Sequence, residues 1–502
     1  MKKRNLLLLL LLYSSFCFSQ ISVFKYPIEF EKVTFQPRDF DSYYLNDPVS
    51  QNSILILKDN KKAEYLLLDK NMKLVSKFSP PGSLTNTVFS MQEEYVGGTA
   101  ADGKFYFAYT ISKRNKIAGM YLETVDPQSK TVSNRELFEL SKYENQGVAF
   151  GNYGNFFLFA IDDKPGEIKI HGLNSAGNNF IKSIKVNIPK SSTKKRLSEY
   201  FDGLKVITAD EEPGLESATG KVKLFHSPGK ISIIVNEYDN PTHIININTE
   251  TFSSEERLID HSSLTKGEKG ISYVNSFLFN ENLYSLILNK KNIRIAVYNS
   301  QNGTLLKTHE INDQTNLTNF AGAPVTETRL GKRTDQKDID DVKKLIKILD
   351  KGSEAIMLYK DQKGRFIVTV GTYDLMGLQS GGDTYLESYY SSSGRAGPGV
   401  SVQQAGNKYF ITVRRPDYPT VITYNANFYK STRFKLMFDP NDHNLIKGVA
   451  SPSLNDQIKD YVAEISKKAQ AKIQFSVDGK QYFGFYDKEM KMYMIEEIMI
   501  RK

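Results

Sequence analysis

The sequence predicts an all-β protein built from a repeated unit of about 50 residues, and three observations support this prediction. Short apolar runs rich in β-branched and aromatic residues alternate with polar turns along most of the chain, which is typical of strands joined by hairpins. Six of these runs recur at nearly regular intervals. A turn-forming Asp or Asn recurs in step with them.

The apolar runs set the period. Their starts lie 51, 51, 75, 52 and 83 residues apart, and they occupy residues 54–57, 105–109, 156–159, 231–235, 283–288 and 366–370. Each of the two long intervals contains a stretch that breaks the strand pattern, so we expect inserts near residues 191–214 and 321–352. The first insert begins with a charged, helix-like segment at 191–203.

The second insert contains an amphipathic helix predicted over residues 335–352, which ends at Gly352. The apolar residues of this helix lie on one face, and they are Ile339, Val342, Leu345, Ile346 and Leu349.

The second repeating feature is an Asp or Asn at the end of the strand that follows each apolar run. Short Asp and Asn side chains bond the backbone two residues on and tolerate left-handed dihedrals, so they close hairpins with little strain. Seven positions fit this pattern: Asp69, Asp126, Asn174, Asn248, Asn299, Asn425 and Asp487. Any single one would be uninformative, but seven in step with the runs indicate a repeat.

A period of about 50 residues, with three or four short antiparallel strands in each unit, is typical of β-propeller blades. Once the inserts are set aside, the chain has room for about seven blades, and six or eight also fit its length. Residues 21–47 precede the first unit and could supply the strand that closes the ring against the last blade. Tandem β-sandwich domains are the alternative, in which the regular step would be a coincidence.

The N-terminus has the three-part build of a secretory signal peptide: a basic start, seven consecutive leucines and a polar stretch with small residues. The leucine run is too short to cross a bilayer, which needs about 20 residues, and no comparable run follows. Cys17 and Ser19 fit the small side chains required at −3 and −1, so we expect residues 1–19 to be the signal peptide. Residues 20–502 then form a single domain. Lipid attachment at Cys17 is an alternative, disfavoured by the bulky Phe16.

Composition argues against several classes of partner and chemistry. The formal charge is +9, but the leader holds three of the 66 basic residues and none of the 57 acidic ones, which leaves +6 on the mature chain. So small and dispersed an excess of positive charge argues against nucleic acid as a partner. Cys17 is the one cysteine, and its removal would leave no thiol for catalysis, zinc binding or disulfides.

The leader and the repeat together resemble secreted bacterial β-propeller proteins as an architectural group. The resemblance implies an exported chain, secreted, periplasmic or associated with the cell surface, with no transmembrane segment after the leader. The sequence lacks Trp altogether, so it carries neither a WD dipeptide nor a sialidase-type Asp box. The resemblance is therefore one of architecture, without a family-defining motif.

The least regular stretch is residues 371–407, which contains eight glycines and a run of serines between two strand-like segments. Long loops on a rigid scaffold often carry binding residues, and Tyr offers a large contact area with few rotamers to freeze. We predict a partner-binding site in and beside this insert, formed by Tyr373, Asp374, Tyr385, Tyr389, Tyr390, Arg395, Arg414 and Arg415. A loop without a partner is the structural alternative.

A further helix is predicted near residues 454–471, with Ile458, Tyr461, Val462, Ile465 and Ala469 on one stripe. Both predicted long helices are expected to pack against the ring.

Catalytic and metal-binding patterns are sparse. The six histidines stand singly, without HExxH or HxH spacing, and no GxSxG elbow or GxxxxGK[ST] loop occurs. No cofactor is expected. The weak candidates for a Ca²⁺ site are two acidic loops, the first with Asp210, Glu211, Glu212 and Glu216 and the second with Asp439, Asn441 and Asp442.

These features favour an exported, non-enzymatic binding or scaffold protein that holds a partner through loops on one propeller face. An envelope or extracellular protein is the expected partner, because Trp, the aromatic residue most used to stack on sugars, is absent. One alternative is a hydrolase or lyase whose groups converge at the channel mouth. Another is a glycan-binding module that works through Tyr platforms.

Overall fold

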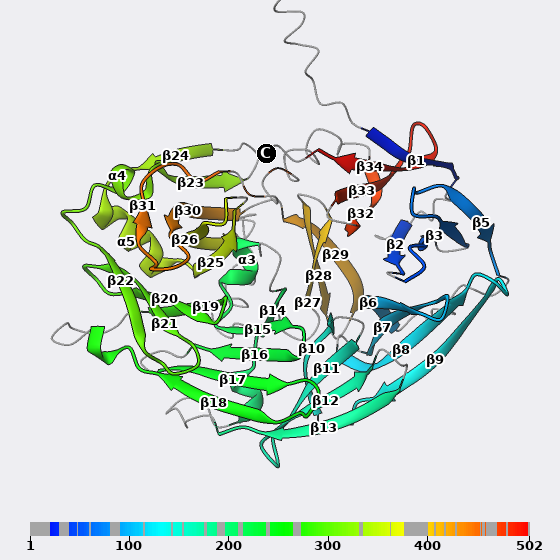
Figure 1. Ribbon diagram of the computed structural model, residues 1–502, viewed down its shortest axis with the longest axis horizontal. Helices are drawn as coiled ribbons and strands as arrows, with labels where there is room; N and C mark the ends of the chain where they lie inside the picture. The colour runs from blue at the N-terminus through cyan, green and yellow to red at the C-terminus, as the bar shows by residue number, and fades with distance from the viewer. Residues whose placement is uncertain are drawn as a thin grey trace, which may run out of the picture.

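Seven antiparallel sheets follow one another around a ring in the computed structural model of the chain (Figure 1). The structure describes residues 21–499 apart from 30–39, 48, 60–61, 81–90, 114–115, 142–143, 153–154, 175–177, 188–195, 209–213, 237–240, 265–272, 331–334, 362, 376–399, 406–407, 416–417, 427–428, 452, 454–456, 458–468 and 478–479. The predicted all-β fold, a propeller of about seven blades, is confirmed.

Five blades are formed by consecutive strands, and each runs from the inside of the ring outward. Their strands are β2 (Phe40–Asn46), β3 (Ser53–Asp59), β4 (Ala63–Leu68) and β5 (Leu74–Phe78) in blade 1; β6 (Met91–Ala101), β7 (Lys104–Lys113), β8 (Lys116–Asp126) and β9 (Thr131–Glu139) in blade 2; β10 (Glu144–Asn152), β11 (Asn155–Asp162), β12 (Glu167–Leu173) and β13 (Asn179–Lys185) in blade 3; β15 (Val222–Ser227), β16 (Lys230–Val235), β17 (Thr242–Asn248) and β18 (Ser254–Ile259) in blade 4; β19 (Tyr273–Phe279), β20 (Asn282–Leu288), β21 (Ile293–Asn299) and β22 (Leu305–Ile311) in blade 5.

The last two blades take their outer strands from elsewhere in the chain. Blade 6 consists of β25 (Glu354–Lys360), β26 (Phe366–Leu375) and β30 (Tyr429–Phe438), and the hairpin of β23 (Val325–Leu330) and β24 (Asp335–Ile339) completes its outer side. The short β31 (Leu445–Ile446) pairs with β30. Blade 7 consists of β32 (Ala469–Val477), β33 (Lys480–Asp487) and β34 (Met492–Ile498), with the N-terminal β1 (Ile21–Pro27) outermost.

Pairing of the two ends of the chain closes the ring. Ile21 lies opposite Glu497 and Pro27 opposite Met492, as expected for a closing strand from residues 21–47. The Tyr26 hydroxyl of β1 donates to Glu64 Oε2 in β4 at 2.6 Å, which ties the last blade to the first.

The six apolar runs are the second strands of blades 1 to 6, namely β3, β7, β11, β16, β20 and β26. A second strand is buried between the two neighbouring blades on both of its faces, so it reads as a continuous apolar run. In β11 every residue from Phe156 to Asp162 is buried. The outer strands face solvent on one side, and β5 and β13 are largely exposed. This layering places the hydrophobic core between the blades.

Five of the seven Asp and Asn markers end a third strand or directly follow one, as the repeat requires. In each case the side-chain oxygen accepts a backbone N–H further along the turn; Asp69 Oδ1 takes those of Asn71 and Lys73, both at 2.8 Å. Two markers do not fit. Asn425 lies in an inserted sheet, and Asp487 opens the turn after the second strand of blade 7. The third strand of blade 6 is followed by Asp439.

The predicted helix over 335–352 is only half correct. Its first part, Asp335–Ile339, is strand β24, because it pairs with the exposed edge of β23. Helix α5 (Val342–Lys351) begins after Asp341, whose side chain accepts the N–H of Lys343 at 2.9 Å, and Gly352 is its C-cap, as predicted. The helix predicted near 454–471 falls mostly outside the described residues, and the prediction is wrong for Ala469, which starts β32.

Candidate functional site

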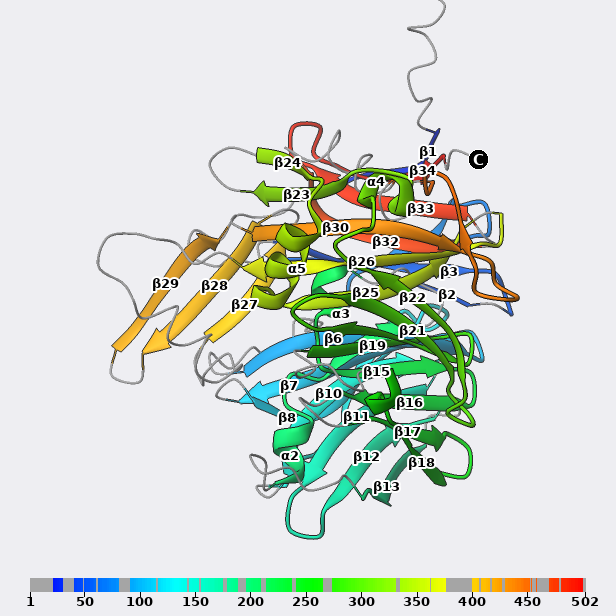
Figure 2. The same cartoon turned by 90° about the vertical axis from the view of Figure 1, so that its left-hand side faces the viewer.

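Most of the structure added to the basic ring gathers at one face, which we call the insert face. Between β26 and β30 the chain forms a separate three-stranded sheet of β27 (Val400–Ala405), β28 (Lys408–Arg415) and β29 (Tyr418–Ala426). Figure 2 shows this inserted sheet standing out from the ring on the same side as α2 (Leu197–Tyr200). The second strand of each blade ends at this face and its first strand begins there.

The chain between blades 3 and 4 extends into the central channel. Strand β14 (Lys205–Thr208) runs parallel to β15 along the innermost edge of blade 4. The one-turn helix α3 (Leu215–Ala218) follows, and it packs against β25 and β26 on the far side, in blade 6. Ile207 and Ala218 are almost completely buried, so β14 and α3, which we call the inner segment, are packed against blades 4 and 6.

A buried polar cluster lies beside the inner segment, and Lys223 of β15 is its centre. The Lys223 Nζ donates to Asn275 Oδ1 at 2.7 Å and to the Ser276 carbonyl at 3.0 Å. The Asn275 amide in turn donates to the carbonyls of Glu354 at 2.9 Å and Thr219 at 3.3 Å. Asn275 therefore joins the first strands of blades 4, 5 and 6 to the residue that follows α3.

Both ionisable groups of this cluster are shifted towards neutrality by burial. The side chain of Lys223 has no exposed surface, and burial lowers its pKa from 10.5 to about 7. Glu354 is 4% exposed, and burial raises its pKa from 4.5 to about 7, against the opposing effects of Lys221 and Lys223. An amine and a carboxyl that both titrate near pH 7 are a common feature of functional sites.

Glu354 also leaves one oxygen without a partner. Its Oε1 is buried and has no hydrogen-bond partner among the described residues, and the same holds for Oγ1 of Thr372, which lies directly opposite it in β26. Both oxygen atoms are buried, in strands that contact α3.

A second buried network continues from Ser276 towards the outside of the ring. Ser276 Oγ lies 3.3 Å from Thr242 Oγ1, which lies 2.9 Å from His261 Nε2, and His261 Nδ1 lies 3.0 Å from the Tyr298 hydroxyl. Burial lowers the pKa of His261 to about 4, so its ring is neutral at pH 7. This network links blades 4 and 5 rather than lining an open site.

The predicted partner-binding residues are brought together only in part. Tyr373 and Asp374 lie near the end of β26, where Asp374 Oδ1 accepts the N–H of Ser353 at 2.8 Å. Asp374 is close enough to Glu354 to raise its pKa. Arg414 and Arg415 end β28 in the inserted sheet. Tyr385, Tyr389, Tyr390 and Arg395 lie outside the described residues.

Sequence reasoning missed Lys223, Asn275 and Glu354. One signal was present, because Lys223 stands alone among the apolar residues of β15 and is buried with them. A single charged residue inside an apolar strand needs a buried partner. The sequence could not show that the partners stand on neighbouring blades.

The candidate metal positions are not brought together in the part of the chain that is described. No group of three or more His, Cys, Asp or Glu side chains in the described ranges is arranged to hold a metal ion. Asp439 and Asp442 each accept a backbone N–H within their own turn, at 2.8 Å. Asp210, Glu211 and Glu212 fall in the gap at 209–213, while Glu216 lies in α3.

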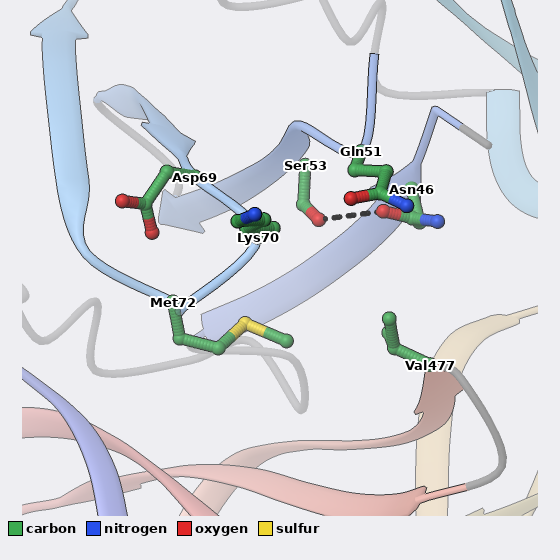
Figure 3. A pocket seen from close by; sticks show the side chains of 7 residues that line it. All are labelled: Asn46, Gln51, Ser53, Asp69, Lys70, Met72 and Val477. Atoms are coloured by element: carbon green, nitrogen blue, oxygen red, sulfur yellow. Dashed lines mark hydrogen bonds between the residues drawn. The ribbon is translucent and has the colours of Figure 1, made fainter. Parts of the chain in front are cut away.

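A small pocket lies on the opposite face, between blades 1 and 7 (Figure 3). Its volume of about 90 Å³ would hold a few water molecules or one small polar group. Asn46 and Ser53 border it and are hydrogen-bonded to each other at 3.0 Å. Its full lining consists of Asn46, Gln51, Ser53, Asp69, Lys70, Met72 and Val477.

The chain matches no known protein family and no curated protein. Solved structures with a similar arrangement include the Dos1 propeller, which is 7% identical, with 96% of each chain covered and a TM-score of 0.31. The propeller domain of the trilobed protease from Pyrococcus furiosus is also 7% identical, with 92% of this chain and 95% of that chain covered and a TM-score of 0.31.

A prolyl endopeptidase is 11% identical at a TM-score of 0.29; 90% of this chain is covered, but the chain spans only 55% of that enzyme. Likenesses this distant do not indicate a function for the chain. None of the described helices is both long and apolar enough to cross a membrane.

Proposed function

We propose that the protein is an exported binding protein that holds an envelope or extracellular protein on its insert face. The observation that carries this proposal is the inserted sheet, a separate sheet added to the ring at that face. Lys223 and Glu354, the described groups whose pKa values are shifted to about 7, are buried within the ring, in strands that contact β14 and α3. The inserted sheet, by contrast, projects away from the ring (Figure 2).

The ring supports such an insert without distortion. Leu375 at the end of β26 lies directly opposite Tyr429 at the start of β30, so the inserted sheet leaves and re-enters the blade at one pair of neighbouring residues. A rigid scaffold with a single projecting element is a common arrangement for recognition, because the scaffold limits the motion that binding must freeze.

The same geometry defines the test. Residues 376–428 are replaced by Asn-Gly, the two-residue hairpin turn that directly opposed strand ends accept. We expect the variant to unfold at the same denaturant concentration as the parent and to lose the protein that the parent captures from a cell-envelope extract. That protein is then purified and rebound to the parent. Equal capture by parent and variant would refute the proposal.

Charge reversal in the inserted sheet gives a second test that does not shorten the chain. The variant Arg414→Glu/Arg415→Glu should weaken capture, because Arg is favoured in protein interfaces. The matched control is Lys290→Glu/Lys291→Glu, an adjacent exposed basic pair in a turn of blade 5 on the same face. An equal loss in both variants would indicate a general charge effect and not a site.

Export is tested separately. N-terminal sequencing of the protein recovered from outside the cytoplasm should begin at Gln20. A lipid-modified Cys17 would instead place the protein on a membrane surface with the ring attached through its N-terminus.

One observation favours a second candidate, a hydrolase or lyase. An amine and a carboxyl with pKa values near 7 could exchange protons with a substrate if α3 moved away. Lys223→Met and Glu354→Gln should then abolish activity with any substrate that the parent turns over, while leaving partner capture unchanged.

A further inference from the structure

Helix α5 lies across blade 6 near the insert face. It follows β24, the outermost strand of the blade, and leads into β25, the innermost one. Its buried side packs against β24 and β26 of blade 6 and against β20 of blade 5, and consists of Val342, Leu345, Ile346 and Leu349. The other side of the helix therefore faces solvent, at the end of the ring that also carries the inserted sheet (Figure 2).

The solvent side of α5 is basic. Lys343, Lys347 and Lys351 stand four residues apart, so they form one line along the helix, which we call the lysine stripe. All three are exposed, and Lys344 lies beside them. In the described part of the chain, neither these lysines nor Asp350, the one acidic residue of α5, forms an ion pair.

The lysine stripe weakens the helix that carries it. Like charges at positions i and i+4 destabilise a helix, and the stripe contains two such pairs, Lys343 with Lys347 and Lys347 with Lys351. An acidic residue at position 347 would instead have made two favourable pairs. The fold gains nothing in return, because no described residue pairs with these charges. A local arrangement that opposes stability without a structural benefit is expected where the residues serve a function.

Building on the proposed function, we propose that the lysine stripe binds an acidic segment of the protein held on the insert face. Successive lysines of the stripe are separated by about 6 Å along the helix axis, at a rise of about 1.5 Å per residue. Alternate residues of an extended chain are separated by about 6.7 Å. An extended segment with Asp or Glu at every second position therefore offers one carboxylate to each lysine.

A protein segment suits this position better than an anionic membrane. Figure 2 shows the inserted sheet extending beyond α5 on the insert side. A flat membrane would meet that sheet before it reached the stripe, whereas an extended segment can pass beside the sheet. The inserted sheet also carries Arg414 and Arg415 at the end of β28, so an acidic partner complements both elements.

Poly-L-glutamate is the probe, because it presents many carboxylates on a flexible chain. The full-length protein should bind fluorescently labelled poly-L-glutamate at about 50 mM salt and release it as the salt concentration rises, since exposed charges are screened. Lys343→Gln/Lys347→Gln/Lys351→Gln should weaken this binding about tenfold, because each exposed ion pair adds little and three are lost. A parent that does not bind the probe, or a triple variant that binds it equally well, would overturn the proposal.

The matched control removes the same charge elsewhere. Lys73→Gln/Lys130→Gln/Lys363→Gln changes three exposed lysines in turns on the opposite face, and it should bind poly-L-glutamate as the parent does. Equal weakening in both triple variants would show a general charge effect and refute the stripe as a binding site. Both variants should unfold at the urea concentration of the parent, since glutamine is a good helix former and the stripe adds no stability.

A second titration uses vesicles of phosphatidylglycerol in place of poly-L-glutamate. We expect the stripe substitutions to weaken binding to poly-L-glutamate. If they weakened binding to the vesicles alone, the stripe would serve a membrane surface and the proposal would be wrong.

Capture from the cell-envelope extract is compared for the parent, the triple stripe variant and the Asn-Gly replacement of residues 376–428. The stripe variant should release its captured protein at a lower salt concentration than the parent does. If the replacement loses the protein and the stripe variant holds it as firmly as the parent, the proposed function is supported and the role of the stripe is refuted. If the replacement captures the protein as the parent does, the proposed function is refuted instead.

Discussion

Replacing Glu354 by Gln should remove a pH dependence of stability that this buried carboxyl imposes. The pKa of Glu354 is about 7 in the folded chain and 4.5 as its ordinary value. Because the folded state holds this proton more tightly, its contribution to stability is complete below pH 4.5 and is lost as the pH rises through 7. Over the window from pH 5 to pH 7, the wild type should lose about 2 kcal/mol of unfolding free energy that the variant keeps.

Lys223 changes the unfolding free energy with pH in the opposite direction to Glu354, and mostly above pH 7. Its pKa falls from 10.5 to about 7, so its contribution is present at high pH and is lost as the pH falls through 7. Since Lys223 remains in both proteins, comparing them at the same pH removes most of its effect.

The assay is urea unfolding at pH 5 and pH 7, followed by far-ultraviolet circular dichroism because the chain has no Trp. Glu250→Gln is the matched control, since Glu250 is exposed in the turn after β17 and should follow the wild type. The unfolding free energies of the wild type and Glu354→Gln could instead change by the same amount between the two pH values, to within about 0.5 kcal/mol. In that case the carboxyl is not the buried group that the structure shows.

Three further substitutions test the packing around the site and the repeat. Asn275→Ala removes one accepted and two donated hydrogen bonds at a fully buried position and should lower the unfolding free energy by about 3 kcal/mol, whereas the exposed Asn302→Ala should change it by less than about 0.5 kcal/mol. Thr372→Val removes a buried hydroxyl without a partner and should leave stability unchanged or raise it by about 1 kcal/mol; a clear loss would mean that the hydroxyl has a partner such as bound water. Asp69→Ala removes two turn hydrogen bonds and should cost about 1 kcal/mol in thermal or urea unfolding, and no loss would show that the turn markers do not stabilise the blades.

The repeat could be predicted from the sequence because two of its features depend on residues that are close together in the chain. A second strand buried on both faces must be apolar throughout, and a turn closed by Asp or Asn needs that residue at one place. The second strand of blade 7 escaped notice because β33 mixes Tyr482 and Tyr486 with a central Gly484, which weakens the aliphatic signal. The pattern failed at Asn425 for a different reason: this residue lies within β29 of the inserted sheet, opposite Phe410, and the next strand, β30, belongs to blade 6.

The predicted partner-binding site stays a prediction. Tyr373 and Asp374 lie near the end of β26, before the insert, and the buried polar groups near them come from several blades. Lys223, Asn275 and Glu354 are far apart in the sequence, and the packing of blades 4, 5 and 6 against one another brings Asn275 within hydrogen-bonding distance of the Lys223 amine and the Glu354 carbonyl. A single sequence holds no record of such convergence, because each residue looks like an isolated polar position in its own strand.

The sequence by itself determined the strand content, the period and most of the turn positions, because these depend on side chains within a few residues of one another. The tertiary structure decided how the ring closes, with β1 on β34, how blade 6 is completed, with β23 on β30, and where α3 packs, against β25 and β26. The physical reason is that an edge strand accepts any partner with a free row of backbone groups. Which partner it takes depends on the edges left open once all the other strands are in place.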